Sequence, residues 1–255
     1  MTNGRLAGRV GLVTGAGQGV GAGIAKALVA DGASVMLAGR TLSKVEDQAE
    51  ALARAGGTVT AMACDVTDRD ALIAAVDTTA GHFGKLDILV NNAQQVPLGP
   101  LHKLDDDAVE AGWQSGPMAV LRAMRAALPH MKAAGGGAIV NLGSSSAFRW
   151  DNGGYGAYGA VKEAIRQLTR AAASEWGRYD IRANVILPLG NSPGMAMWSE
   201  HNPDEAAAFV KTVPLGRVGD CEDDIGRAVA WLCSDEAGYV TGQSIGLDGG
   251  QARLV

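Results

Sequence analysis

The sequence Arg9-Val10-Gly11-Leu12-Val13-Thr14 leads directly into Gly15-Ala16-Gly17-Gln18-Gly19-Val20-Gly21, so a glycine-rich turn follows a short apolar run. The apolar run predicts a buried strand, and apolar residues at helical spacing from 24 to 29 predict a helix after the turn. Glycines in such a turn let the backbone approach a pyrophosphate, and the helix N-terminus supplies free N–H groups. We therefore predict a dinucleotide-binding loop rather than a merely flexible one. Its cofactor-facing residues are expected to be Gly15, Gln18, Gly19, Val20 and Gly21.

Strand-like and helix-like segments alternate along the rest of the chain. Further strands are predicted at 34–38, 58–63, 86–90, 138–142, 181–187 and 244–248. Amphipathic helices are predicted at 42–55, 68–83, 105–133, 158–176 and 223–234. This alternation implies right-handed βαβ units, and therefore an α/β fold with a doubly wound parallel sheet of about seven strands and helices on both faces. One domain, 1–255, is the simplest organisation.

Two segments interrupt this pattern. Gly116-Pro117 lies inside the 105–133 helix, and we expect a kink there because proline lacks an N–H and restricts the residue before it. The segment 188–213 contains Pro, Gly, Met and Trp with weak periodicity. A long irregular segment after a strand of such a sheet is typical of a lid, so we predict that 188–213 covers the substrate.

The composition limits the class of protein. The chain has 255 residues, of which 47% are hydrophobic, so we expect a globular domain. A net charge of -5 and the lack of a basic block argue against nucleic acid or an anionic membrane as partner. Cys64, Cys221 and Cys233 have neither disulfide nor metal-ligand spacing. No apolar segment has the form of a secretion signal or the length of a membrane span, so we expect a cytoplasmic protein.

The ends of the second and third predicted strands indicate which dinucleotide binds. A carboxylate after the second strand suits the ribose of NAD, whereas an arginine suits a 2′-phosphate. Position 39 is Gly and the next residue is Arg40, although Gln18 adds no second positive charge. NADP(H) is therefore favoured, with NAD(H) as the alternative, and Arg40 could also be simply solvated. Asp65 could bind the adenine amino group or cap the following helix, for which Thr67 is better placed.

Tyr158 and Lys162 are spaced to lie on one face of a helix. An ammonium beside a phenol favours the phenolate, so Lys162 is expected to lower the pKa of Tyr158. A phenol tuned towards neutral pH can donate and accept a proton. The pair could also be neighbours by chance, and the interpretation depends on the surrounding motifs. Tyr155 is a poor alternative because Gly159, not a lysine, lies four residues later.

These motifs together resemble the short-chain dehydrogenase/reductase family, in its compact single-domain branch. The resemblance spans nearly the whole chain, and the order and spacing of the motifs make it specific. It implies a Rossmann-type sheet, oxidoreductase activity on alcohols or ketones with NAD(P)(H), and a homo-oligomer, either a tetramer or a dimer. The matching stretches are Thr14–Gly21, Asp65-Val66, Asn91-Asn92-Ala93, Tyr158xxxLys162, Pro214–Arg217, Tyr239–Gln243 and Asp248–Gly250.

The resemblance also implies roles for individual residues. Tyr158 would protonate a carbonyl oxygen or deprotonate an alcohol, while Lys162 would lower its pKa and hold the nicotinamide ribose. Ser144 would hydrogen-bond the reacting oxygen, with Ser145 as the alternative. The nicotinamide would supply or accept the hydride. Further cofactor contacts implied are Arg40, Asp65, Val66, Asn92, Ala93 and Pro188.

Three positions depart from the family pattern. Gly116 stands where the family has an Asn that supports a water-mediated proton relay, Gln94 replaces the last glycine of the NNAG motif, and Leu189 replaces the glycine of a Pro-Gly pair. We expect either that a carbonyl freed at the Gly116-Pro117 kink anchors the relay water, or that Gln94 binds the substrate. A dinucleotide-binding sensor or scaffold without turnover is the alternative function. The retained Tyr158, Lys162 and a serine favour the enzyme.

The residues expected around the substrate are mostly apolar or aromatic. Such a lining predicts a hydrophobic or ring-containing small molecule. About half of the side chains expected near the pocket should be ordinary packing residues. This set comprises Gln94, Gln95, Phe148, Trp150, Tyr155, Leu189, Met195, Met197 and Trp198. The candidate substrate contacts are Gln94, Ser144, Trp150, Tyr155 and Leu189.

Overall fold

A seven-stranded parallel sheet forms the middle layer of the computed structural model, which describes residues 4–148 and 153–251. The strand order is β3-β2-β1-β4-β5-β6-β7, so the order reverses between β1 and β4. This confirms the predicted doubly wound sheet. The strands are β1 (Val10–Thr14), β2 (Ser34–Gly39), β3 (Val59–Ala63), β4 (Ile88–Asn91), β5 (Gly137–Leu142), β6 (Ile181–Pro188) and β7 (Ser244–Leu247).

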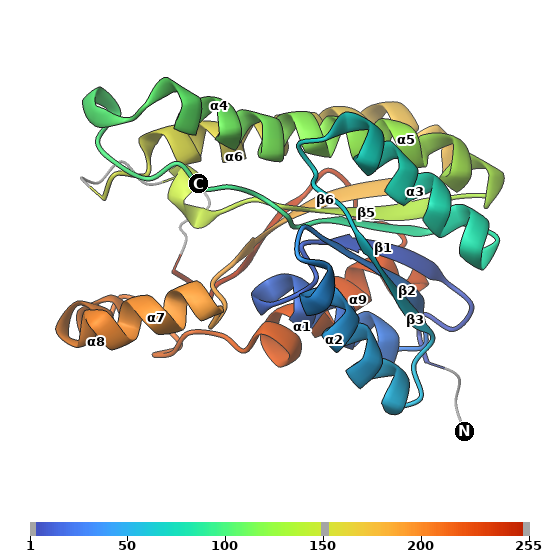
Figure 1. Cartoon of the computed structure of the whole chain (residues 1–255), viewed down its shortest axis with the longest axis horizontal. Helices are drawn as coiled ribbons and strands as arrows, with labels where there is room; N and C mark the ends of the chain where they lie inside the picture. Colours follow the sequence, from blue (N-terminus) through green and yellow to red (C-terminus); the bar gives the residue numbers. More distant parts are fainter. Residues whose placement is uncertain (1–3, 149–152, 252–255) are drawn as a thin grey trace.

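Helices cover both faces of the sheet. They are α1 (Gly19–Ala30), α2 (Leu42–Arg54), α3 (Arg69–Phe83), α4 (Asp106–Trp113), α5 (Ala119–Ala133), α6 (Gly156–Trp176), α7 (Pro193–His201), α8 (Pro203–Val210) and α9 (Arg227–Cys233). Figure 1 shows α3, α4, α5 and α6 on one face and α1, α2 and α9 on the other. None of the helices in residues 4–148 and 153–251 has the length and apolar character to cross a membrane.

Side chains alternate between the two faces of the sheet along each strand, so a hydrophobic core forms on each face. Leu12 on β1 lies beside Met36 on β2 and Leu89 on β4, and this row belongs to the core that packs against α3, α5 and α6. The next residue, Val13, points to the opposite core, which includes α1 and α9. Successive side chains of a strand face opposite sides, so a central strand covered on both faces has no exposed position. The continuous apolar runs of the sequence reflect this double burial.

The predicted break at Gly116-Pro117 takes the form of a π-helical turn, Gln114–Met118, between α4 and α5. Ala119 at its end donates its N–H to the carbonyl of Gln114, five residues back. Pro117 has no N–H and its ring displaces the carbonyl four residues earlier, which disfavours the α-helical pattern. The predicted single helix over 105–133 is therefore two helices joined by this turn. A second π-helical turn, Cys221–Gly226, precedes α9.

The segment 188–213 is largely helical, so the prediction of an irregular segment is wrong. It contains α7 and α8, which project together to one side of the sheet in Figure 1. Ser192 caps α7 by accepting a hydrogen bond from the N–H of Met195, and Pro193 occupies the first turn. Pro203 likewise occupies the first turn of α8, although Asn202 before it makes no side-chain capping hydrogen bond. A cap residue followed by proline is a helix-start signal that the search for apolar periodicity overlooked.

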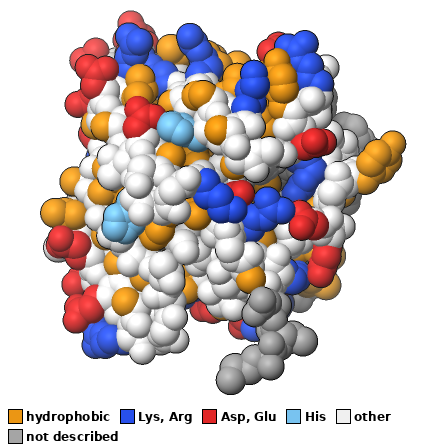
Figure 2. Space-filling model, turned by 90° about the vertical axis from the view of Figure 1, so that its right-hand side faces the viewer, with side chains coloured by type: hydrophobic (Ala, Val, Ile, Leu, Met, Phe, Trp, Pro, Cys, Tyr) orange, Lys and Arg blue, Asp and Glu red, His pale blue; other side chains and the backbone are white. Residues whose placement is uncertain are grey.

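The side of the molecule opposite α7 and α8 carries acidic and basic side chains interspersed with one another (Figure 2). Ion pairs join loops at the amino ends of the strands, such as Arg9 with Asp235 at 2.6 Å. Mixed charges of this kind are typical of a solvent-facing surface.

Candidate active site

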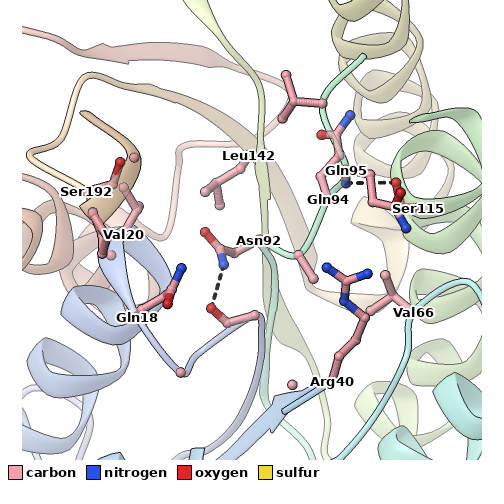
Figure 3. Close-up of a pocket in the computed structure, with 18 of the residues that line it drawn as sticks. Gln18, Val20, Arg40, Val66, Asn92, Gln94, Gln95, Ser115, Leu142 and Ser192 are labelled. Atoms are coloured by element: carbon pink, nitrogen blue, oxygen red, sulfur yellow. Dashed lines mark hydrogen bonds between the residues drawn. The ribbon is translucent and has the colours of Figure 1, made fainter. Parts of the chain in front are cut away.

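A cavity of about 660 Å³ opens at the carboxyl ends of the strands, where the strand order reverses. It collects most of the predicted site residues (Figure 3). Gly21 and Tyr155 are not part of its lining, and Trp150 lies outside the described residues. The predicted residues that line it are Gly15, Gln18, Gly19, Val20, Arg40, Asp65, Val66, Asn92, Ala93, Gln94, Ser144, Tyr158, Lys162, Pro188 and Leu189.

Asn92 fixes the glycine-rich turn from the neighbouring strand. Its Nδ2 donates to the carbonyls of Thr14 at 2.9 Å and Gly15 at 3.0 Å. Gly15 has a φ of 67°, and a Cβ atom there would lie 2.6 Å from that same Nδ2. A Cβ atom at Gly21 would also collide with Asn92. These two glycines are required by the close approach of Asn92, so the structure explains them without a ligand.

Gln18 stands at the N-terminus of α1 without capping it. The first N–H groups of the helix are therefore available to an anion, whose binding the helix dipole also favours. Gly19 has a φ of 57°, and a Cβ atom there would lie 3.2 Å from Cβ of Ser192 at the start of α7. The segment after β6 thus meets the glycine-rich turn directly and forms one wall of the cavity.

Lys44 supplies a second cation on the cavity wall, in addition to Arg40, that the sequence-based reasoning missed. Its Nζ donates to Oε1 of Gln18 at 2.8 Å, and both Lys44 and Arg40 line the cavity. Gln18 and Lys44 are 26 positions apart, so no local pattern links them. The available signal was the position of Lys44 in the first turn of α2, four residues after Arg40.

Asp65 lies after β3, close to Arg40. It accepts hydrogen bonds from the backbone N–H of Thr67 at 2.9 Å and the Thr67 hydroxyl at 2.8 Å. Burial acts to raise the pKa of Asp65, but these two hydrogen bonds and the charge of Arg40 together lower it. The cap of α3 is Asp68, so neither Asp65 nor Thr67 serves as that cap.

Tyr158 and Lys162 lie in the first two turns of α6. Nζ of Lys162 is 5.5 Å from the centre of the Tyr158 ring and donates to the carbonyl of Leu142 at 2.6 Å. Only 4% of Lys162 is exposed, and burial lowers its pKa to about 7. Because the charged form of a lysine needs solvation or a counter-charge, this side chain is poised to lose its proton near neutral pH.

Burial raises the pKa of Tyr158 to about 12, although its hydrogen bond with Ser144 acts to lower it and Tyr155 adds to the increase. The net shift of the Tyr158 pKa is therefore upward, not downward as expected from Lys162 alone. Desolvation outweighs the attraction of a lysine that itself tends towards neutrality. Tyr158 is accordingly a protonated phenol at neutral pH.

The structure separates the two candidate serines. Ser144 hydrogen-bonds Tyr158, and its Oγ lies 2.7 Å from Oγ of Ser146. Ser145 instead donates to Oε1 of Gln251 at 3.1 Å. Only Ser144 of these two lines the cavity.

A buried polar chain positions α6 against the sheet, and the sequence-based reasoning did not identify it. Nδ2 of Asn91 donates to Oδ1 of Asn141 at 2.8 Å, and Nδ2 of Asn141 donates to Oγ1 of Thr169 at 2.8 Å. The chain joins β4, β5 and α6 within the core. Buried polar groups paired in this way define one arrangement of the elements that carry them.

The loop after β4 meets the π-helical turn beside the cavity. Oγ of Ser115 accepts from the N–H of Gln95 at 2.9 Å and donates to the carbonyl of Ala111 at 2.7 Å. Figure 3 draws Ser115 beside Gln94 and Gln95. Both Oε1 and Nε2 of Gln94 are buried, and neither has a hydrogen-bond partner among residues 4–148 and 153–251. A Cβ atom at Gly116 would lie 3.0 Å from that Nε2.

Comparison with known proteins identifies the family. The sequence model of a family described as enoyl-(acyl carrier protein) reductase matches residues 15–252. A solved structure of a short-chain type dehydrogenase/reductase from Mycobacterium ulcerans has a TM-score of 0.90 and 33% identity, and the match covers 96% of this chain and 90% of that one. The chain belongs to the short-chain dehydrogenase/reductase family.

This dehydrogenase/reductase is similar along its whole length to several named enzymes. It is 36% identical to a 12alpha-hydroxysteroid dehydrogenase from Clostridium sp., over 96% of this chain and 97% of that protein. It is 37% identical to cis-4-hydroxycyclohexanecarboxylate dehydrogenase from Sinomonas cyclohexanicum, with the same shares covered. A protein from Beutenbergia cavernae, provisionally assigned as an NAD(P)-dependent gluconate 5-dehydrogenase, binds NADP at low occupancy and has a TM-score of 0.89, 32% identity and 96% and 97% coverage.

The cavity of this dehydrogenase/reductase fits a nicotinamide dinucleotide. The uncapped start of α1 and the glycine-rich turn can receive the pyrophosphate, and the end of β2 lies at the adenosine side. Tyr158, Lys162 and Ser144 lie on the wall near the end of β5, where the nicotinamide would be expected. The protein is therefore an oxidoreductase of alcohols or ketones that uses NAD(P).

Proposed function

We propose that this enzyme transfers a hydride between NADP(H) and a hydrophobic, ring-containing ketone or secondary alcohol, with Tyr158 as general acid/base. The observation that carries the proposal is that Ser144, Tyr158 and Lys162 together line the cavity that also holds the glycine-rich turn. Hydride transfer to a carbonyl needs neither an activated protein nucleophile nor a metal ion. A proton donor next to a hydride donor is sufficient.

Each of the three side chains has a defined role in this reaction. The Ser144 hydroxyl donates to the oxygen of the substrate carbonyl and orients it. Tyr158, protonated at neutral pH, gives its proton to that oxygen as the carbon is reduced, and in the reverse direction its phenolate accepts the proton of the alcohol. Lys162 stabilises the phenolate that remains and holds the nicotinamide ribose. When bound, the nicotinamide supplies or accepts the hydride.

The preference for NADP(H) rests on Arg40 together with Lys44. Both are cations on the wall of the cavity, at the end of β2 and the start of α2. A phosphate ester gains charge-assisted hydrogen bonds from two such groups, whereas the bare ribose of NAD(H) gains little from them. Gly39 leaves no carboxylate where NAD(H) would need one.

The substrate class rests on the apolar part of the lining and on the relatives. Val96, Leu189 and Met195 line the cavity, and two relatives are named for rings that bear a hydroxyl group. We therefore favour a cyclic substrate over an acyclic polyol. We also expect 188–213 to close over this substrate, and we expect a cytoplasmic homo-oligomer, a tetramer or a dimer. All of these stay predictions.

A dinucleotide-binding sensor is the second candidate. Gly116 favours it, because glycine lacks the side-chain amide that would support a proton relay. The discriminating experiment measures NADPH and NADH oxidation by the purified protein against cyclic and aryl ketones, with alcohols and NADP⁺ in the reverse direction. Turnover with preference for NADPH supports the enzyme. Cofactor binding without turnover on any of these compounds supports the sensor.

A further inference from the structure

The side chain of Gln94 occupies a slot that only glycine leaves open. A Cβ atom at Gly116 would lie 3.0 Å from Nε2 and 3.3 Å from Cδ of Gln94, and 2.8 Å from Cγ1 of Val161. Any larger residue at 116 would therefore press on both neighbours. The side chain of Gln94 is therefore packed between the π-helical turn and α6, near Val161, the residue that precedes Lys162.

In this slot the side-chain amide of Gln94 lacks hydrogen bonds to the described part of the chain. Its oxygen and nitrogen are both buried and have no hydrogen-bond partner in the described part of the chain. Buried amide groups in folded proteins are nearly always paired, and an exception calls for an explanation such as a functional role. An orientation in which the amide reaches water or a ligand would recover those hydrogen bonds.

The backbone around Gln94 is held on both sides. The N–H groups of Asn92 and Ala93 donate to Oγ1 of Thr14 at 3.0 and 3.2 Å, and the N–H of Gln95 donates to Ser115 at 2.9 Å. These bonds anchor the backbone on either side of Gln94, so a change of side-chain rotamer moves the amide without breaking them. Gln94 lines the same cavity as Ser144 and Tyr158, so rotation about its side-chain bonds directs the amide towards the substrate space.

Building on the proposed function, we propose that Gln94 is a specificity-determining residue that turns out of the Gly116 slot to hydrogen-bond a second polar group of the substrate. The first polar group is the reacting oxygen, which Ser144 and Tyr158 hold. An amide both donates and accepts, so the second group is an uncharged hydroxyl, carbonyl or carboxamide on the ring. The apolar lining accommodates the ring between the two. The substrate is thus a cyclic ketone or alcohol with oxygens at two separated positions.

The experiment compares kcat/KM for cyclohexanone and 4-hydroxycyclohexanone with NADPH. The wild-type protein is expected to prefer the hydroxylated ring. Gln94→Met keeps the length of the side chain and removes its hydrogen bonds, so the preference should fall about tenfold. Gly116→Ala closes the slot and forces the side chain outward, so it should keep or increase the preference. Gln167→Met, an exposed change on α6, controls for the gain of a methionine.

The thermal midpoint provides a readout that separates substrate binding from a structural role. The amide in the slot has no partner among the described residues, so Gln94→Met should leave the midpoint unchanged or raise it. A substrate preference equal in the Gln94→Met and wild-type proteins, or a lowered midpoint in that variant, would overturn the proposal. If the wild-type protein reduces neither ketone, nor any in the wider panel, the proposed function itself fails and this inference fails with it.

Discussion

Nζ of Lys162 donates a 2.6 Å hydrogen bond to the carbonyl of Leu142, so the helix that carries Tyr158 is tied to the end of β5. Ser144 follows Leu142 by two residues and hydrogen-bonds Tyr158. The buried Lys162 therefore connects α6 with the end of β5, and these two elements carry the proposed catalytic residues. The parallel register of β5 with its neighbours positions Leu142 and Ser144. The four-residue spacing on α6 places Tyr158 and Lys162 on one face of that helix.

Lys162→Met should greatly reduce turnover. The variant keeps an unbranched side chain but lacks the ammonium that stabilises the phenolate and the bond to Leu142. We expect kcat to fall on the order of 10²–10⁴-fold, the usual range for loss of support to a general acid/base. Steady-state kinetics measure this, with circular dichroism to check folding. A folded variant within threefold of wild type contradicts the role given to Lys162.

The pH dependence should have opposite signs in the two directions. Burial lowers the pKa of Lys162 to about 7 and raises that of Tyr158 to about 12, so below pH 7 the site holds an ammonium and a phenol. Reduction uses this protonated form, so its initial rate should fall as the pH rises through 7. Oxidation needs a proton acceptor, and above pH 7 the neutral Lys162 amine can take up the proton that Tyr158 passes on from the alcohol, so the oxidation rate should rise over the same interval. Rates measured from pH 5.5 to 9 that follow the same sign in both directions contradict this assignment.

Arg40→Ala and Lys44→Ala should each weaken the preference for NADPH. Each removes one cation from the predicted 2′-phosphate site, so we expect KM for NADPH to rise about tenfold while KM for NADH changes little. Lys26→Ala is the matched control, because Lys26 is an exposed lysine on α1 that pairs only loosely with Glu222 at 3.9 Å. An equal effect on both cofactors places these residues away from the 2′-phosphate.

Asn141→Ala should destabilise the fold. It leaves Nδ2 of Asn91 buried without its acceptor and removes the donor to Thr169, whose hydroxyl keeps its bond to the carbonyl of Ile165. A buried group left unpaired costs about 1–3 kcal/mol. We expect the free energy of unfolding to fall by about 3 kcal/mol in urea titrations. Asn191→Ala, at an exposed position between β6 and α7, is the comparison. Equal midpoints for the two variants indicate that the polar chain contributes nothing to stability.

Local patterns were sufficient for the sheet and for the glycine-rich turn. Strands such as β1 are buried on both faces, so each one appears as an uninterrupted apolar run. The helices α7 and α8 were missed because their apolar periodicity is weak and only Ser192, Pro193 and Pro203 mark their starts. Capping chemistry, rather than amphipathic pattern, was the usable signal there.

The candidate site shows where sequence reasoning runs out. Tyr158 and Lys162 were identified from their spacing, but the direction of the pKa shift of Tyr158 depends on how deeply α6 is buried, which spacing does not reveal. Lys44 and Gln18 meet only because β2 returns beside β1. The contact between Gln94 and Gly116 likewise depends on the π-helical turn. Contacts between distant segments carry the information that local patterns lack.

The most direct test of the account is NADPH oxidation by Tyr158→Phe beside the wild-type protein, with a cyclic ketone that the wild type reduces. NADPH binding is measured in parallel by fluorescence titration. We predict that the variant binds NADPH as the wild type does and loses turnover by on the order of 10²–10⁴-fold, because the phenol proton is the one delivered to the substrate. Tyr239→Phe, at a fully exposed tyrosine, should behave as the wild type. A Tyr158→Phe protein that reduces the ketone at the wild-type rate would contradict the central claim.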